Sequence, residues 1–269
     1  MRVIGLCRFS YPAVGGFQVE HDTQEAREAY LYAPERMAER FRTFETITLP
    51  PLRAQTDPDF TFLVVIGESL PTVYRDRLMA LLEDIPQAVV QAHPPRRHRK
   101  IMQEAINSVR VFDSDPCLQF RMDDDDAVAC TFVERLRSVA QDVRALAQKH
   151  RHFAIDFNQG YIIRPGPDGI HAASTKAPYS TAALAIVVEP VTKLTVMNFA
   201  HAKVSQNMPT VTLTGEDMLL RGHNRFNDSR QKPGVRPTKL ALLDAAGEAH
   251  FKTTYNIDSN QVRRVFSAP

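Results

Sequence analysis

The sequence contains only three cysteines, Cys7, Cys117 and Cys130, and no Cys-x-x-Cys pair among its 269 residues. An odd number of widely spaced cysteines excludes a disulfide framework and a cysteine-based zinc site, and it indicates a reducing compartment. The longest apolar run, Ala182–Val188, is far too short to span a membrane. The first eight residues lack the apolar core and cleavage site of a signal peptide. We therefore expect a cytoplasmic protein, with peripheral attachment to a membrane left open.

The chain also lacks a charge imbalance, because its net charge is only +2. This gives no overall case for binding nucleic acid. The GxxxxGK phosphate loop, the GxGxxG dinucleotide fingerprint, the HExxH zinc motif and the nucleophile elbow of serine hydrolases are all absent. Hydrophobic residues make up 43% of the sequence, enough for a substantial core in a chain of this length. One large domain with a C-terminal extension fits these numbers best.

Apolar patterning predicts alternating strands and helices up to the residues around position 123. The predicted strands are Val3–Cys7, Phe60–Ile66, Gln87–Gln91 and the apolar stretch from Cys117 to Met122. The predicted helices are Glu35–Gln55, which Pro50-Pro51 should break or kink, Thr72–Glu83 and His98–Phe112. This β-α-β-α-β-α-β order predicts an α/β fold with a mostly parallel sheet covered by helices on both faces.

The pattern changes after a further predicted helix at Thr131–Gln148. Short strands are predicted at Phe153–Phe157, Tyr161–Arg164 and Ile170–Ser174, and a Pro-Gly-Pro-Asp-Gly turn indicates that the last two form an antiparallel hairpin. Leu184–Val188 adds another short apolar run, and the last sixty or so residues are basic and poorly periodic. We divide the chain into a catalytic core at 1–190 and a C-terminal acceptor-side segment of the same domain at 191–269.

Four consecutive aspartates occupy positions 123–126, directly after an apolar stretch. Each neighbouring pair of carboxylates at ~6 Å repels by roughly 2–3 kcal/mol at an effective dielectric constant of ~20. Such a run persists where solvent surrounds it or where a cation neutralises it. Solvated acidic runs normally lie in polar, low-complexity surroundings, whereas this one lies between a predicted strand and a predicted helix, where α/β proteins place ligands. The context favours a metal site.

Mg²⁺ or Mn²⁺ held by one or two carboxylates keeps its other positions for water and substrate phosphates, which is its usual arrangement with nucleotides. Adjacent strand residues point to opposite faces, so aspartates two positions apart can converge. Asp123 with Asp125, or Asp124 with Asp126, could form such a site. A D-x-D pattern alone is common, but its position after a strand in an α/β series strengthens it.

The segment His93–Lys100 is the sharpest basic cluster in the sequence. If it follows the third strand, it faces the same sheet edge as the aspartates, and Arg97, Arg99 and Lys100 could neutralise a diphosphate leaving group. A solvated basic loop that opens a helix fits these residues equally well. No aromatic residue is interleaved among the cations, which disfavours a nucleic-acid patch.

Three polar residues in the C-terminal third complete the candidates. His223 could complete a metal site or contact a phosphate. Glu216 or Asp217 could act as the general base toward an acceptor hydroxyl. An isolated histidine is more often structural or exposed, and acidic residues ahead of Met218-Leu-Leu also fit the first turn of an ordinary helix.

Several of these segments together resemble one family. Residues 49–66 resemble the segment of inverting family-two glycosyltransferases in which a helix ends in Q-T-x-x-x-F before the second strand. Residues 120–127 resemble the acidic D-x-D loop of the same enzymes. With the Arg-Phe-Ser-Tyr segment at 8–11 and a late H-N-x-x-N segment, they are most similar to a bacterial group of rhamnosyltransferase-like glycosyltransferases. The resemblance covers most of the chain.

This resemblance implies a GT-A fold, a nucleotide-sugar donor and a divalent metal. It implies that Asp123 lies near the nucleotide ribose and that Asp125 binds the metal. We group Asp124 with Asp123 on the donor and Asp126 with Asp125 on the metal.

The resemblance also places Arg8 and Ser10 beside the nucleotide base. The chain departs from the family at the end of the second strand, where aspartates that read the base are usual and Ile-Gly-Glu68 stands here. We expect Glu68 to substitute from a shifted position.

The expected function is metal-dependent transfer of a sugar from a nucleotide-sugar donor to a hydroxyl of a glycan or related acceptor, with inversion. Two alternatives stay open from the residues. A metal-dependent phosphohydrolase or nucleotidyltransferase would use the same aspartates, and a non-catalytic nucleotide- or carbohydrate-binding module would bind its ligand without turnover. The sequence does not indicate an oligomeric state.

Overall fold

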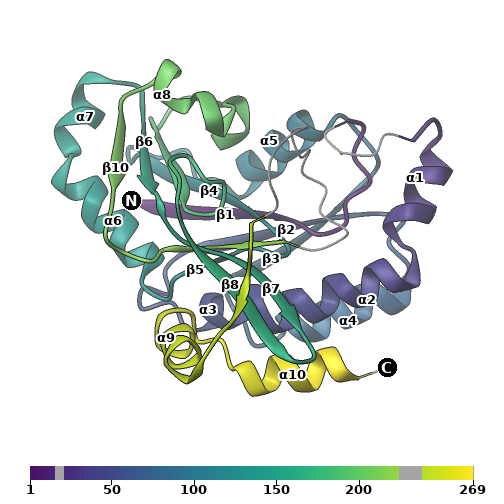
Figure 1. The fold of residues 1–269 in the computed structure, drawn as a ribbon. Coiled ribbons are helices and arrows are strands. Elements are labelled where there is room, and N and C mark those ends of the chain that lie inside the picture. The colour runs from purple at the N-terminus through teal and green to yellow at the C-terminus, as the bar shows by residue number, and fades with distance from the viewer. Residues whose placement is uncertain (16–20, 224–237, 269) are drawn as a thin grey trace.

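The computed structural model describes residues 1–15, 21–223 and 238–268 (Figure 1). A seven-stranded sheet in the order β10-β6-β9-β4-β1-β2-β3 forms its centre. Its strands are β1 (Arg2–Arg8), β2 (Thr61–Gly67), β3 (Ala88–His93), β4 (Cys117–Asp123), β6 (His152–Phe157), β9 (Leu184–Val188) and β10 (Thr210–Leu213). Only β9 runs against its neighbours, β4 and β6. The α/β fold with a mostly parallel sheet expected from the sequence is confirmed.

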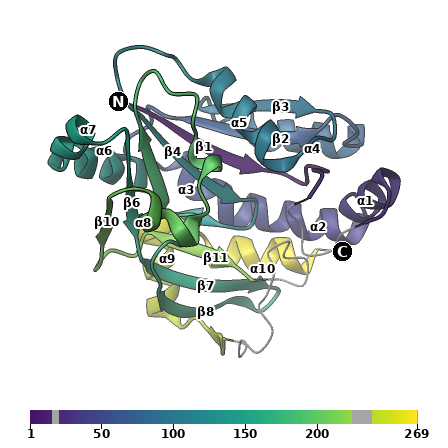
Figure 2. The same cartoon turned by 90° about the horizontal axis from the view of Figure 1, so that it is seen from above.

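Helices cover both faces of this sheet (Figure 2). The first face is covered by α2 (Pro34–Thr43), the π-helix η1 (Phe44–Thr48), α3 (Leu49–Arg53), α4 (Thr72–Leu82) and α6 (Phe132–Asp142). The second is covered by α5 (His98–Val109), η2 (Val196–Asn198), α8 (Val204–Asn207) and the end of α1 (Gln24–Leu31). In β2, Phe62 and Val64 pack into the first core and Leu63 and Val65 into the second. Burial on both faces explains its continuous apolar sequence.

Two helix predictions need correction. Of the break or kink expected at Pro50-Pro51, the break is wrong, since α2, η1 and α3 follow one another without interruption. The π-turn η1 lies directly ahead of the two prolines, and its wider hydrogen-bonding pattern accommodates residues that lack a backbone N–H. The single helix expected at 131–148 is in fact two, α6 and α7 (Arg144–Lys149), which meet at Val143.

A second sheet of five strands, in the order β12-β8-β7-β11-β5, lies beside the first. Its members are β5 (Ala127–Val128), β7 (Gln159–Gly166), β8 (Gly169–Lys176), β11 (Leu219–Gly222) and β12 (Ala241–Leu242), with α9 (Ala245–Tyr255) and α10 (Ser259–Ser267) next to it (Figure 1). The predicted β7–β8 hairpin is confirmed. The alternative reading of residues 216–220 as a helix start is wrong, because β11 is a strand paired with β5 and β7.

Residues beyond 190 belong to both sheets, since β10 completes the first and β11 and β12 complete the second. Assigning this segment to the acceptor side stays a proposal. Two short elements, η3 (His201–Lys203) and α8, precede β10. Among the described helices, none combines the length and the hydrophobicity needed to cross a bilayer.

Candidate active site

The candidate site lies at the carboxyl edge of the main sheet. Because β1 to β4 are parallel, their last residues meet at one edge, and Arg8 of β1 stands in register with Asp123 of β4. A turn through Asp124 and Asp125 then leads into β5. The basic segment His93–Lys100 runs from the end of β3 into the first turn of α5, so it lies at the same edge, as expected from the sequence.

Asp123, Asp125 and Asp126 converge, and we call them the acidic triad. One ligand oxygen from each lies within 4.8 Å of the others. The turn brings them together, since Asp126 N donates to Asp123 O at 3.2 Å and Asp123 N donates to Asp126 Oδ2 at 3.2 Å. Asp125 and Asp126 are buried and Asp123 is partly exposed. Strand alternation does not set this geometry, because the strand ends at Asp123.

Asp124 is buried and is not among the described residues whose ligand oxygens converge. Its carboxylate forms an ion pair with Arg40 of α2, and only 3% of each side chain is exposed. The same Arg40 Nη1 lies 3.7 Å from Asp125 Oδ2. Thr48 Oγ1 donates to the Asp124 carbonyl at 3.0 Å. The segment from α2 through η1 therefore holds the acidic turn in place.

The triad carries excess negative charge. Burial raises the pKa of Asp126 well above its usual range, and the nearby Asp125 and Asp123 carboxylates raise it further. The Asp123 backbone N–H and the Arg221 guanidinium act in the opposite direction. Convergent carboxylate oxygens are the donors that hard cations prefer, and a divalent ion would offset the repulsion. The residues present therefore fit Mg²⁺ or Mn²⁺.

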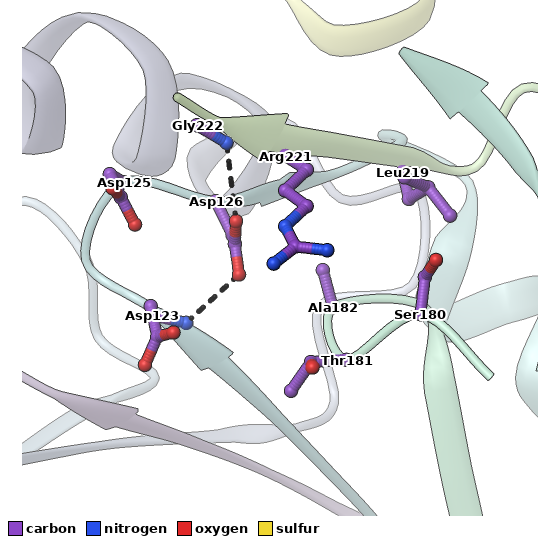
Figure 3. Close-up of a pocket in the computed structure, with 9 residues that line it drawn as sticks. All are labelled: Asp123, Asp125, Asp126, Ser180, Thr181, Ala182, Leu219, Arg221 and Gly222. Atoms are coloured by element: carbon purple, nitrogen blue, oxygen red, sulfur yellow. Dashed lines mark hydrogen bonds between the residues drawn. The ribbon is translucent and has the colours of Figure 1, made fainter. Parts of the chain in front are cut away.

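A small recess, open to solvent, adjoins the triad (Figure 3). Its other walls are Leu219, Arg221 and Gly222 of β11 and the loop Ser180-Thr181-Ala182. That loop follows Tyr179, which has a left-handed φ of 62°. Tyr179 N donates to the buried Asp156 at 2.8 Å, and its carbonyl lies 2.8 Å from His201 Nδ1. Two hydroxyl groups are thus held opposite the carboxylates.

Strand β11 contacts the acidic turn through Gly222. A Cβ at this position would lie 2.4 Å from the Asp125 carbonyl oxygen, and Gly222 N donates to Asp126 Oδ1 at 3.3 Å. We expect Gly222→Ala to push β11 off the turn, with a loss of about 1–3 kcal/mol in unfolding free energy and weaker metal binding. Urea unfolding and a metal titration measure both. Gly166→Ala is the control, since its Cβ would lie 3.1 Å from Oδ1 of the exposed Asp168 and at an ordinary 3.9 Å from the Gly169 carbonyl oxygen. Wild-type behaviour of Gly222→Ala would contradict the close approach.

Cations gather on the α5 side of the triad. Arg8 Nη2 lies 3.9 Å from Asp123 Oδ1. Arg97, Arg99 and Lys100 are exposed where α5 begins. Ser10, with a left-handed φ of 44°, is buried and accepts a hydrogen bond from Arg36 Nη1 at 3.0 Å. The predicted donor-side cations therefore share one edge with the aspartates.

Burial lowers the pKa of His98 to about 3, and Arg8, Arg121 and Arg99 contribute in the same direction. In the unfolded chain the same histidine has its ordinary pKa of about 6.5. As the pH falls below this value, the unfolded state binds a proton that the folded state does not bind, so the free energy of unfolding decreases. We expect the wild type to lose about 2 kcal/mol more than His98→Gln between pH 7 and pH 5. Unfolding free energies at both pH values measure this, with the exposed His150→Gln as the control. Equal losses in wild type and His98→Gln would refute the assignment.

The remaining predicted site residues lie outside the recess lining. Glu216 forms a two-point ion pair with Arg135 at 2.7 and 2.8 Å. Asp217 accepts from Gln159 Nε2 at 2.9 Å and Tyr161 OH at 3.2 Å, and its Oδ2 lies 2.9 Å from His250 Nε2. Their role as general base stays a prediction.

His223 and Glu68 also stay predictions. His223 is exposed directly after β11, and it is not among the described residues that converge with the triad. Glu68 is exposed at the end of β2, and its backbone N donates to His93 O at 3.0 Å. Asn224 and Asn227 of the H-N-x-x-N segment lie outside the described residues.

Three solved structures are similar to this chain at low sequence identity. S. aureus TarS 1–349 in complex with UDP-GlcNAc shares 10% identity over 85% of this chain and 60% of that one, with a TM-score of 0.45. S. aureus TarS shares 9% identity over 83% and 37%, with a TM-score of 0.43. A nucleoside-diphosphate-sugar pyrophosphorylase from Vibrio cholerae RC9 shares 15% identity over 83% and 91%, with a TM-score of 0.31. This chain thus spans less than two thirds of either TarS structure.

The sequence comparisons give one clear result. No curated protein matches the chain. The model of the family described as "Putative rhamnosyl transferase" matches residues 2–236, a range that includes both sheet cores, the acidic triad and β11. The chain therefore belongs to this rhamnosyl transferase family.

Proposed function

We propose that the protein transfers a sugar from a nucleotide-sugar donor to a hydroxyl group of a glycan or related acceptor, with Mg²⁺ or Mn²⁺ as cofactor. The observation that carries the proposal is the acidic triad, whose ligand oxygens lie within 4.8 Å of one another at the carboxyl edge of the sheet. Ligands of open α/β sheets bind at this edge. Membership of the rhamnosyl transferase family supports the reaction class.

Asp125 and Asp126, with Asp123, would hold the ion. When bound, the ion supplies positive charge that stabilises the departing nucleoside diphosphate. Asp123 is the partly exposed member of the triad, which suits a second contact with the donor ribose. The burial of Asp124 against Arg40 supports a role in fixing the turn, beside the donor role expected from the sequence.

The donor lies along the β1–β3 ends in this proposal. Arg8, beside Asp123, and the exposed Arg97, Arg99 and Lys100 add positive charge near the leaving group. Ser10 and Glu68, at the ends of β1 and β2, border the nucleotide base. The left-handed backbone of Ser10 and the hydrogen bond that its hydroxyl accepts from Arg36 support a defined conformation at the end of β1, as binding sites often have.

The acceptor hydroxyl needs a base, and we propose Asp217 or its neighbour Glu216 from their position ahead of β11. Deprotonation by a carboxylate opposite the leaving group would invert the anomeric carbon. Inversion is proposed by analogy with the family-two enzymes that the sequence resembles. The acceptor would then approach from the side of the second sheet.

Product analysis tests the function. The protein is incubated with a panel of labelled nucleotide sugars, Mn²⁺ and glycan acceptors, and the products are identified by mass spectrometry and NMR. Intact sugar on the acceptor and one equivalent of free nucleoside diphosphate are expected. Release of free sugar alone would identify a hydrolase, transfer of the nucleotidyl group would identify a nucleotidyltransferase, and binding without turnover would identify a binding module. Each of these three results would contradict the proposal.

A further inference from the structure

Arg221 occupies a distinctive place in the recess. It lies on β11 between Leu220, which pairs with Ala127 of β5, and Gly222, which donates to Asp126. Both neighbours tie β11 to the residues that carry and follow the acidic triad. Figure 3 shows the guanidinium directed into the recess, beside Asp126 and across from Thr181. The backbone of Arg221 is therefore fixed, while its side chain reaches into the open space.

The guanidinium does not pair with the carboxylates that share its recess. Within the described residues, no carboxylate oxygen lies within 4.0 Å of Arg221, although Asp123, Asp125 and Asp126 line the same walls. Arg40 contrasts with it, because Arg40 is buried and ion-paired with Asp124. Arg221 is exposed, and its guanidinium donates no hydrogen bond to the part of the chain that the structure describes.

We infer that Arg221 binds the diphosphate of the donor within the recess, beside the triad. The inference rests on the proposed function. A guanidinium matches the oxygen geometry of a phosphate with two parallel hydrogen bonds, which neither lysine nor a hydroxyl can reproduce. The negative charge of the triad attracts the guanidinium, yet the two do not form an ion pair among the described residues. This arrangement leaves the carboxylates to a cation and the guanidinium to a phosphate. The diphosphate then lies between that cation and Arg221.

This assignment differs from the donor-side cations at α5. Arg97, Arg99 and Lys100 lie where α5 begins, after β3 of the first sheet. Arg221 belongs to β11 of the second sheet and lines the recess together with Ser180 and Thr181. It would hold the phosphate nearest the sugar, where negative charge grows as the glycosidic bond breaks.

Inorganic pyrophosphate is the probe, because it carries the diphosphate without base or sugar. Its affinity is measured by calorimetry with Mn²⁺ present for wild type, Arg221→Gln and Arg221→Lys. We expect a 10- to 100-fold loss for Arg221→Gln and a smaller loss for Arg221→Lys. Arg164→Gln is the matched control, since Arg164 is an exposed arginine on the neighbouring strand β7 and does not line the recess. Circular dichroism and urea unfolding establish that the variants fold.

Wild-type affinity of Arg221→Gln for pyrophosphate would overturn the inference and leave the proposed function intact. A raised KM for the acceptor in Arg221→Gln, with unchanged affinity for pyrophosphate, would also overturn the inference and would assign Arg221 to acceptor binding. Failure of the wild type to bind either pyrophosphate or any nucleoside diphosphate in the presence of Mn²⁺ would overturn the inference and the proposed function together.

Discussion

Turnover of the nucleotide-sugar donor by Asp125→Asn is expected to fall by at least about 10³-fold, which corresponds to roughly 4 kcal/mol of lost transition-state stabilisation. Asp125 contributes one of the three convergent ligand oxygens, and asparagine removes its charge with little change in shape. The neutral amide would leave the metal ion with one anionic ligand fewer and would weaken its binding. The negative charge of the departing nucleoside diphosphate would then be less well stabilised. Steady-state rates over a range of Mn²⁺ concentrations measure the effect.

Two further variants separate a metal effect from a folding effect. Asp123→Asn changes the partly exposed member of the triad, so it perturbs the buried charges less and is expected to give a loss in the same direction. Asp115→Asn is the control, because this exposed aspartate lies in the loop ahead of β4. Full, metal-dependent turnover by Asp125→Asn would refute the assignment of the triad.

Arg40→Met is expected to lower the unfolding free energy by about 3–5 kcal/mol. The change removes the ion pair between Arg40 and Asp124, whose side chain is only 3% exposed. It also removes the cation that lies 3.7 Å from Asp125 Oδ2. The cost arises from the loss of this buried charge pair, so the double variant Arg40→Met with Asp124→Asn is expected to recover a large part of the loss.

Urea unfolding of the two single variants and the double variant measures this coupling. Arg42→Met is the control, since Arg42 lies two residues further along α2 and bonds the Ala268 carbonyl at the surface. Two results would show that the buried pair does not hold the acidic turn. One is a loss of unfolding free energy below about 1 kcal/mol for Arg40→Met, and the other is an equal loss for Arg40→Met and for the double variant.

The first half of the fold could be predicted from the sequence because its signals are local. The strands β1 and β2 are continuous apolar runs, and α4 repeats its apolar residues at helical spacing. Their alternation then restricts the topology to a parallel sheet. The chain stays helical through Pro50-Pro51 because the π-turn η1 directly precedes the two prolines, and the apolar pattern of the sequence carries no signal for a π-turn.

The second sheet could not be predicted in the same way. Strands β5 and β12 have two residues each, and β11 pairs with β5 across about ninety residues of chain. Such short strands carry no periodic signal, so residues 218–222 fit a helix and a strand equally well by sequence. Only the long-range pairing decides between them.

The acidic run was the strongest indication of a site in the sequence. The sequence alone could not show which of the four aspartates converge and which one pairs with another part of the chain. The strand ends at Asp123, so alternation no longer applies, and the turn joins Asp126 to Asp123 and Asp125. Asp124 instead meets Arg40, which lies 84 positions earlier. Arg221 and the Ser180-Thr181 loop likewise reach the recess through tertiary contacts, and only an Arg-Gly pair at the end of an apolar run marks Arg221 in the sequence.

Binding of Mn²⁺ followed by electron paramagnetic resonance tests the central claim most directly, because free and protein-bound Mn²⁺ give different signal intensities. The wild type and the Asp123→Asn, Asp125→Asn and Asp126→Asn variants are titrated with and without a panel of nucleoside diphosphates. The account predicts one Mn²⁺ per chain in the wild type, tighter in the presence of one nucleoside diphosphate, and at least tenfold weaker binding in each variant. Binding of Mn²⁺ by all three variants with wild-type affinity would contradict the metal site on which the proposed function depends.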